Sequence, residues 1–126
     1  HKRMTRFTMT PEDAVNLIEW SYKEPNSHGK IVIPMIKALK ITDIAKSLGK
    51  AYGHDNIKLS YVGIRPGEKL HEAMISETES FRTEQHENYY MIADEVINTE
   101  CWTYSSDISL MKSKETDKFL KISGVI

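Results

Sequence analysis

The stretch Gly63-Ile64-Arg65-Pro66-Gly67-Glu68-Lys69-Leu70-His71-Glu72 is the most informative part of this 126-residue chain. Pro66 suits the first turn of a helix, because its φ is already helical and its missing N–H would have no partner there. The sequence therefore predicts a helix from Pro66 to about Ser76. The run just before it, Ile57-Lys58-Leu59-Ser60-Tyr61-Val62, is typical of a strand. We thus expect Arg65 where a strand ends and the free N–H groups of a helix begin.

Such a position favours a phosphate, because free N–H groups and the positive end of the helix dipole attract anions. Arg65 adds a planar fork of donors that suits bidentate phosphate contact, and Gly67 lets backbone and ligand approach closely. Glu68 is an acceptor for hydroxyl protons, so the stretch offers groups for both the phosphates and the diol of a nucleotide-sugar. A second interpretation stays open, in which Glu68 only complements the helix dipole and Arg65 pairs with a surface acid.

The composition excludes several classes of protein. The chain is 40% hydrophobic and 28% charged with a net charge of −1, which fits one globular domain. This near-neutral balance argues against a nucleic-acid binder. No apolar run approaches the ~20 residues of a membrane span, and no signal peptide opens the chain. The single Cys101 excludes an internal disulfide and a cysteine-built zinc site, so we expect a cytoplasmic setting.

Local signals predict helices and short strands along the chain. Thr10, followed by Pro11, Glu12 and Asp13, marks the start of a helix that should run to about Lys23. The other expected elements are a strand at Ile31–Ile33 ended by Pro34, a helix from Thr42 to a C-cap at Gly53, a mobile loop at residues 77–88, a strand at Tyr89–Ile92 and a short terminal helix at Asp117–Ile122. Because strands and helices alternate with short links, the sequence indicates an α/β fold with parallel strands.

The chain carries no motif of a catalytic centre. His71-Glu72 begins like a zinc-protease motif, but Ile75 stands where the second histidine ligand would be. No glycine pattern matches a Rossmann fingerprint or a Walker loop, and no Gly-x-Ser-x-Gly elbow is present. We therefore expect no catalytic residue, no cofactor-binding residue and no metal ligand on this segment.

Four blocks in a fixed order resemble the C-terminal part of CapD-like polysaccharide-biosynthesis enzymes. They are Met4–Phe7, Thr10–Val15, Lys40–Ala45 and Gly63–Glu72. These enzymes are extended short-chain dehydrogenase/reductases that act on UDP-N-acetylglucosamine as 4,6-dehydratases and as epimerases. The similarity covers roughly residues 3–95, and Tyr104-Ser105-Ser106-Asp107 is also similar to the C-terminal ends of these enzymes.

The resemblance implies the architecture and the partners. Residues 1–126 would form a nucleotide-sugar-binding C-terminal domain, with residues 96–126 as a C-terminal extension, in an α/β enzyme whose Rossmann half is missing here. That half would hold the family's glycine-rich loop and Tyr-x-x-x-Lys pair and would bind NAD(P), so no cofactor is expected on this segment. The implied partners are a UDP-sugar and the chain's own Rossmann domain, while a homo-oligomer stays open.

The resemblance also implies the site residues. Arg6 and Arg65 would hold the pyrophosphate, and Glu68 would reach the ribose hydroxyls. The segment alone is predicted to be inactive, as part of an NAD(P)-dependent dehydratase or epimerase. An alternative stays open, in which the chain is a non-catalytic module that binds a nucleotide-sugar or a protein partner. Met35 and Thr8 depart from the family's usual residues, so the choice between dehydratase and epimerase also stays open.

Overall fold

The structure is a computed structural model that describes residues 1–126. Its contacts divide the chain into two compact units whose segments alternate along the sequence. Unit 1 comprises His1–Thr8, Lys37–Glu72 and Ser106–Ile126, and unit 2 comprises Met9–Ile36 and Ala73–Ser105. The sequence predicts one domain over residues 1–126, whereas the contacts of the structure form two clusters.

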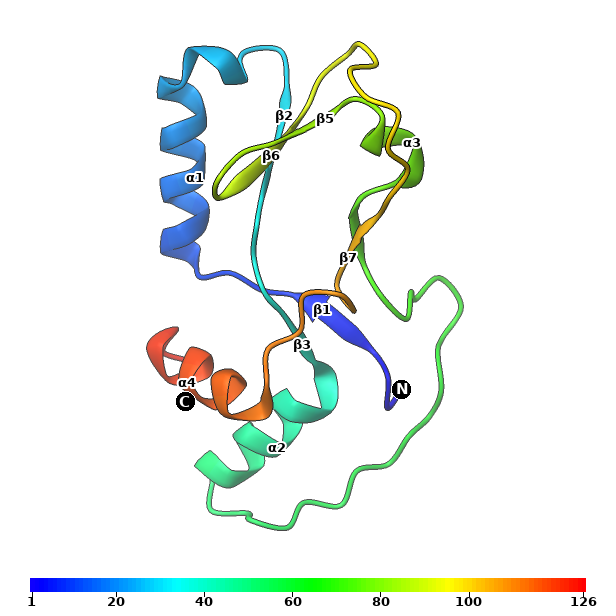
Figure 1. Cartoon of the computed structure of the whole chain (residues 1–126). Coiled ribbons are helices and arrows are strands. Elements are labelled where there is room, and N and C mark those ends of the chain that lie inside the picture. Colours follow the sequence, from blue (N-terminus) through cyan, green and yellow to red (C-terminus); the bar gives the residue numbers. More distant parts are fainter. The chain divides into compact units, whose positions relative to one another are not determined.

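Unit 1 contains a two-stranded sheet and a pair of helices (Figure 1). Strands β1 (Thr5–Phe7) and β3 (Ala38–Lys40) pair antiparallel, and helix α2 (Ile41–Ala51) follows β3 directly. Helix α2 packs against helix α4 (Ser113–Ile122), where the Ser47 hydroxyl donates toward the Asp117 carboxylate. The buried residues of this unit are Thr5, Ala38, Leu39, Ser47, Ser106, Thr116 and Leu120.

Unit 2 contains a three-stranded sheet, a two-stranded sheet and three helical segments. The larger sheet has the order β2 (Ile31–Pro34), β6 (Tyr89–Ile92), β5 (Thr83–Gln85), and the smaller one pairs β4 (Ala73–Ile75) with β7 (Tyr104–Ser105). The helical segments are α1 (Pro11–Lys23), η1 (Pro25–Ser27) and α3 (Glu77–Ser80). Trp20 of α1 lies on Tyr89 of β6, with ring centroids 4.1 Å apart. The buried apolar residues are Ile75, Met91, Ile92 and Tyr104.

Several predicted elements are confirmed. Helix α1 covers the expected range and begins with a capping box, in which the Thr10 hydroxyl oxygen accepts the Asp13 N–H and the Asp13 carboxylate accepts the Thr10 N–H. The strands at Ile31–Ile33 and Tyr89–Ile92 are present as β2 and β6. Helix α2 begins one residue before Thr42, and Gly53 follows its end with a φ of +81°. Helix α4 contains the predicted terminal helix but begins four residues earlier, at Ser113.

The predicted parallel arrangement is wrong, because every sheet of the structure is antiparallel. A parallel pair needs a chain that returns after a helix as a strand beside the first strand. After α2 the chain does not return in this way, since the expected strand at residues 57–62 is irregular and the expected helix at residues 66–76 is absent. The helix and strand alternation in the sequence therefore does not build a βαβ unit.

The segment predicted as a loop, residues 77–88, holds α3 and β5. Ser76 caps α3 through a second capping box with Glu79, and these hydrogen bonds lower the pKa of the Glu79 carboxyl. The side-chain amide of Asn98 donates to the carbonyls of Ser80 and Thr83, at 3.0 and 3.1 Å. Caps and side-chain bonds thus order a stretch whose composition alone indicates a loop.

Two buried hydroxyls join three distant stretches of unit 1. The Oγ1 of Thr5 lies 2.6 Å from the Oγ of Ser106 and 2.7 Å from the Nδ1 of His71. The Ser106 Oγ also accepts the Glu72 N–H at 2.9 Å. Thr5 and Ser106 are 1% and 0% exposed, so these bonds are shielded from water. They fasten residues 71 and 72 to β1 and to residue 106.

The two hydroxyls can satisfy the whole cluster. The Ser106 Oγ accepts the Glu72 N–H, and either hydroxyl can donate in the bond between Ser106 and Thr5. When Ser106 donates to Thr5, the Thr5 hydroxyl is free to donate to the Nδ1 of His71.

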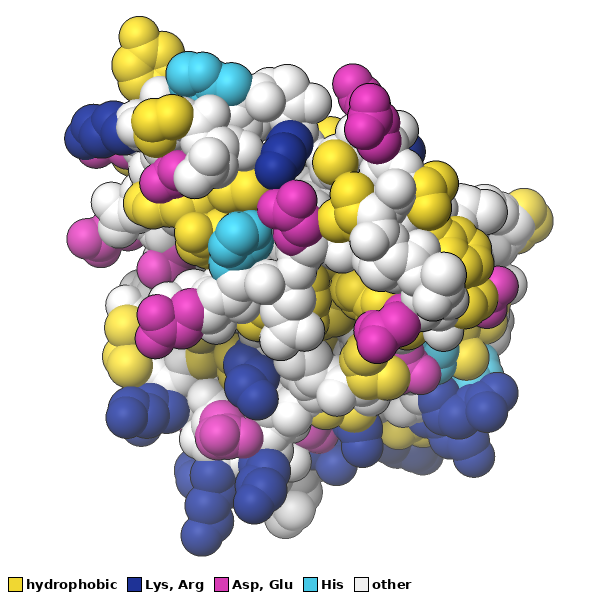
Figure 2. Space-filling view, turned by 45° about the horizontal axis from the view of Figure 1, so that its top comes forward, with side chains coloured by type: hydrophobic (Ala, Val, Ile, Leu, Met, Phe, Trp, Pro, Cys, Tyr) yellow, Lys and Arg dark blue, Asp and Glu magenta, His cyan; other side chains and the backbone are white.

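Charge is divided very unevenly between the units. Unit 1 holds fourteen of the seventeen Lys and Arg residues but only seven of the eighteen Asp and Glu residues, a net charge of +7. Unit 2 holds the other three basic and eleven acidic residues, a net charge of −8. Figure 2 shows lysine and arginine side chains gathered on part of the visible face. The near-neutral total is therefore an average of two strongly charged parts.

None of the helices has the length and apolar character needed to cross a membrane.

We predict a pH-dependent contribution of the α1 capping box. The hydrogen bonds from Thr10 lower the pKa of the Asp13 carboxyl from its ordinary value of 3.8, so the ionised carboxylate stabilises the folded state above that value. This stabilisation is lost as the pH falls through the lowered pKa. Asp13→Asn should therefore reduce the free energy of unfolding at pH 7, by about 1 kcal/mol as for other caps, and should not do so near pH 2. Thermal unfolding followed by circular dichroism at both pH values measures this difference.

Glu12→Gln is the matched control, because Glu12 lies beside Asp13 in the first turn but makes no capping bond. The prediction is contradicted if Asp13→Asn lowers stability equally at both pH values.

We predict that Thr5→Val destabilises the chain by about 1–3 kcal/mol, the usual cost of leaving buried polar partners without a hydrogen bond. Valine keeps the shape of threonine but removes the oxygen shared by Ser106 and His71. Urea unfolding measures the loss. Thr99→Val is the control, since Thr99 is exposed, and it should change stability by less than about 0.5 kcal/mol. Similar losses in the two variants would show that the buried hydroxyl is dispensable.

Candidate functional site

The predicted site begins with a tight turn at residues 65–68. The Glu68 N–H donates to the Arg65 carbonyl at 3.0 Å, and Gly67 has a φ of +84°. Proline at the second position, glycine with positive φ at the third and this hydrogen bond define a type II β-turn. The expected helix start at Pro66 is therefore wrong, because the Pro-Gly pair closes a turn that no helix continues. Arg65 has no helix N-terminus beside it.

The side chain of Arg65 is available to a ligand. Arg65 is exposed and its guanidinium forms no ion pair in the structure. Its backbone N–H donates to Oε2 of Glu68 at 3.1 Å, which closes the turn from the other side. Both residues are exposed, and Oε1 of Glu68 and the guanidinium of Arg65 form no hydrogen bond within the chain. Attraction for an anion at this turn thus comes from the Arg65 side chain itself.

Arg6 has a different role from the one expected. Its Nη1 donates to the Thr5 carbonyl at 2.6 Å and lies 3.4 Å from the Leu70 carbonyl, and its Nη2 donates to the Lys69 carbonyl at 2.9 Å. Its Nε lies 3.4 Å from the Glu72 carboxylate. Of the five N–H groups of a guanidinium, these contacts leave one, on Nη2, for any further partner. Arg6 therefore holds the backbone of Lys69 and Leu70, which directly follow Glu68.

The structure places the three predicted residues along one segment of unit 1. Arg65 and Glu68 lie within the turn, and Arg6 binds the backbone of the next two residues. The cluster of Thr5, His71 and Ser106 then fastens the end of that segment. Sequence reasoning found the blocks that contain His71 and Ser106 but missed these positioning residues, because no local signal links two residues so far apart.

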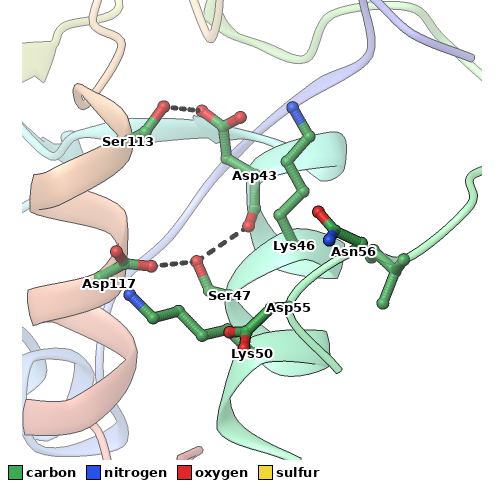
Figure 3. Close-up of a pocket in the computed structure, with 9 residues that line it drawn as sticks. Asp43, Lys46, Ser47, Lys50, Asp55, Asn56, Ser113 and Asp117 are labelled. Atoms are coloured by element: carbon green, nitrogen blue, oxygen red, sulfur yellow. Dashed lines mark hydrogen bonds between the residues drawn. The ribbon is translucent and has the colours of Figure 1, made fainter. Parts of the chain in front are cut away.

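A cavity of unit 1 is a separate feature. It has a volume of about 310 Å³ and lies between α2, α4 and residues 55–57 (Figure 3). The Ser47 Oγ lies 2.9 Å from the Asp43 carbonyl oxygen and also contacts the Asp117 carboxylate, and Ser113 donates to the Asp43 carboxylate at 3.0 Å. Two of these contacts, between Ser113 and Asp43 and between Ser47 and Asp117, link α4 to α2. It contains none of the predicted site residues.

Neither unit shows a set of side chains suited to a metal ion or a dinucleotide. No three His, Cys, Asp or Glu residues are grouped as metal ligands. The glycines with positive φ, at positions 29, 53, 63, 67 and 124, lie in separate turns and form no glycine-rich loop.

Comparison with known proteins identifies the family. Residues 1–94 match the family described as "Polysaccharide biosynthesis protein". A UDP-N-acetylglucosamine 4,6-dehydratase (inverting) of Campylobacter jejuni is 42% identical over 94 residues, which cover 75% of this chain and 26% of that protein. The capsular polysaccharide biosynthesis protein CapD of Staphylococcus aureus is 34% identical over 127 residues, covering 98% of this chain and 21% of CapD.

A UDP-glucose 4-epimerase of Rickettsia canadensis is 35% identical over 89 residues, covering 71% of this chain and 26% of the epimerase. The chain thus spans about a quarter of the length of these relatives. Among solved structures, the X-ray structure of Pen from Bacillus thuringiensis superposes with a TM-score of 0.82 over 100% of this chain and 40% of Pen. The two are 22% identical, so this likeness shows the fold alone. The chain belongs to the CapD-like polysaccharide-biosynthesis family of dehydratases and epimerases.

Proposed function

We propose that this chain is the nucleotide-sugar-binding portion of an NAD(P)-dependent UDP-sugar 4,6-dehydratase or epimerase, acting in the cytoplasm in surface polysaccharide biosynthesis. The relatives named above, which act on UDP-N-acetylglucosamine and UDP-glucose according to their names, support the substrate class. NAD(P) would supply hydride transfer from a Rossmann half outside this segment. The residues of this chain would bind the substrate and orient it.

The exposed fork of Arg65 on a closed turn carries the proposal. A guanidinium without a protein partner keeps its donors for a bidentate contact with the pyrophosphate. The turn fixes the backbone from which this side chain extends. Unit 1, which holds Arg65, has a net charge of +7, and this charge favours approach of the doubly negative UDP group.

The other two residues have distinct roles in this proposal. Glu68 uses Oε2 to close the turn, so Oε1 is its free acceptor for the ribose hydroxyls. Arg6 offers only one N–H to a phosphate, and its main contribution is to hold the backbone of Lys69 and Leu70 in place. Binding therefore depends on Arg65 and Glu68 directly and on Arg6 mainly through position.

We predict that Arg65→Ala weakens UDP binding by about 2–3 kcal/mol, or roughly 30- to 150-fold, because a charge-assisted contact is lost. Isothermal titration calorimetry with UDP measures this change. Lys58→Ala is the charge-matched control, since Lys58 is an exposed cation of the same irregular stretch, and it should have little effect. Arg6→Ala should weaken binding and also lower the melting temperature. Equal affinity in Arg65→Ala and the parent chain would remove Arg65 from the site.

We predict that Glu68→Gln separates the ribose role from a role in the turn alone. Glutamine keeps an oxygen that can accept the Arg65 N–H, so the turn persists, but it replaces a charged acceptor for the diol with a neutral one. UDP should then bind roughly tenfold more weakly. Inorganic pyrophosphate, which has no ribose, should bind no worse. If both ligands lose affinity in parallel, Glu68 supports the turn and does not contact the ribose.

A further inference from the structure

The outer side of α4 combines lysines with exposed aliphatic side chains, and we call it the lysine face. It consists of Lys114, Lys118 and Lys121 with Ile122 and Val125. The lysines recur at positions i, i+4 and i+7, so they share one side of the helix, and all three are exposed. Ile122 and Val125 are 71% and 50% exposed. Three charges and two apolar groups are thus presented to solvent.

Other positions of α4 pack on the rest of unit 1. Thr116 and Leu120 are 0% and 5% exposed, and the Asp117 carboxylate accepts a hydrogen bond from Ser47 of α2. These residues hold the helix in place without using the lysine face. A ligand can therefore cover the lysine face and leave the packing of α4 intact.

The charge of the lysine face is not neutralised within the chain. None of its lysines is in an ion pair. The two acidic groups of α4 are bonded elsewhere, because the Glu115 carboxylate accepts the Lys112 N–H at 2.6 Å and Asp117 contacts Ser47. Since unit 1 as a whole has a net charge of +7, this surface attracts anions.

Basic side chains of α2 extend the charged surface. Lys50 and Lys121 line the same cavity, which has a volume of about 200 Å³. Figure 3 shows the Lys50 side chain extending from α2 toward α4. Asp117 also lines this cavity, but its carboxylate is bonded to Ser47. Lys46 is exposed and lies one turn before Lys50 on the same side of α2, so cations of two helices border one region.

We propose that the lysine face docks on the anionic headgroups of a lipid bilayer. Its ammonium groups lie among the charged lipid headgroups, and Ile122 and Val125 reach the boundary with the acyl chains. An anionic surface attracts unit 1, with its net charge of +7, and repels unit 2, with its net charge of −8. Charge alone therefore selects the unit that contacts the lipid.

A nucleic acid would match the lysines but not the aliphatic side chains. Phosphates of the nucleic-acid backbone attract lysines, but proteins that bind single strands also stack the bases on aromatic rings. The lysine face has no aromatic side chain. Aliphatic groups beside lysines are the combination that interfacial helices carry. The lipid surface thus accounts for both kinds of side chain.

The association should be weak and reversible. Each lysine near an anionic surface strengthens binding roughly fivefold, so the three lysines together contribute roughly 100-fold. The apolar part is small, because only two aliphatic side chains take part. Binding should also be sensitive to salt, which screens exposed charges beyond about 10 Å at 0.1 M ionic strength.

Co-sedimentation with lipid vesicles tests the proposal. We expect the parent chain to bind vesicles of phosphatidylcholine with about 30% phosphatidylserine and not vesicles of pure phosphatidylcholine, because only the former are anionic. Binding should weaken in about 0.5 M salt. Lys114→Ala/Lys118→Ala/Lys121→Ala should lower the partition coefficient roughly 100-fold.

Ile122→Ser/Val125→Ser separates the apolar part of the contact from the charged part. This variant should bind the anionic vesicles roughly tenfold more weakly than the parent, and its binding should depend on salt as the parent's does, because apolar contacts are not screened.

Lys2→Ala/Lys37→Ala/Lys58→Ala is the matched control. It removes the same charge from unit 1 at three exposed lysines outside the lysine face, and it should bind at least about tenfold more tightly than the lysine-face variant. Circular dichroism checks that every variant is folded. A parent chain that leaves the anionic vesicles unbound, or equal losses in the two lysine variants, would overturn the proposal. So would tighter binding of the parent to single-stranded RNA through the same lysines.

Discussion

The buried hydrogen bond between Thr5 and Ser106 is the contact on which unit 1 depends. It joins the first strand to a residue 101 positions later, and it lies where no water competes for either hydroxyl. His71 and the N–H of Glu72 bond to the same two oxygens, so the segment that leads back to Arg65 is fastened at this point. Arg6, the next residue of β1, holds the same segment through its contacts with the carbonyls of Lys69 and Leu70. The candidate site is thus positioned by polar contacts more than by apolar packing.

The sequence predicts elements whose signals are local. The α1 capping box, the β-branched residues of β2 and the glycine after α2 each act within a few residues, and each element is where those signals place it. The Pro-Gly pair shows the limit of this reasoning, because proline fits both the first turn of a helix and the second position of a type II turn. Gly67 in the next position favours the turn. Residues that meet only in three dimensions, such as His71 and Ser106, have no local signal.

The residues of the candidate site also divide into those with local signals and those without. The sequence predicts Arg65 and Glu68 as neighbours, and they share a turn, although the helix expected to support them is absent. The role of Arg6 came from family resemblance, and its neighbours change that role, since four of its N–H groups point at this chain. The average charge of the chain also concealed the contrast between its units. The net charge of the whole chain therefore does not indicate which ligands each unit attracts.

The alternation of the two units along the sequence has a consequence for folding during synthesis. The three-stranded sheet of unit 2 has all its strands once Ile92 has left the ribosome. Unit 1 must wait for Ser106 and α4, although its strand β1 precedes every strand of unit 2 along the chain. During that interval β1 lacks the hydroxyl partner that its Thr5 has in the finished chain. Contacts of such long sequence separation slow folding, so the unit that contains β1 is the one completed last.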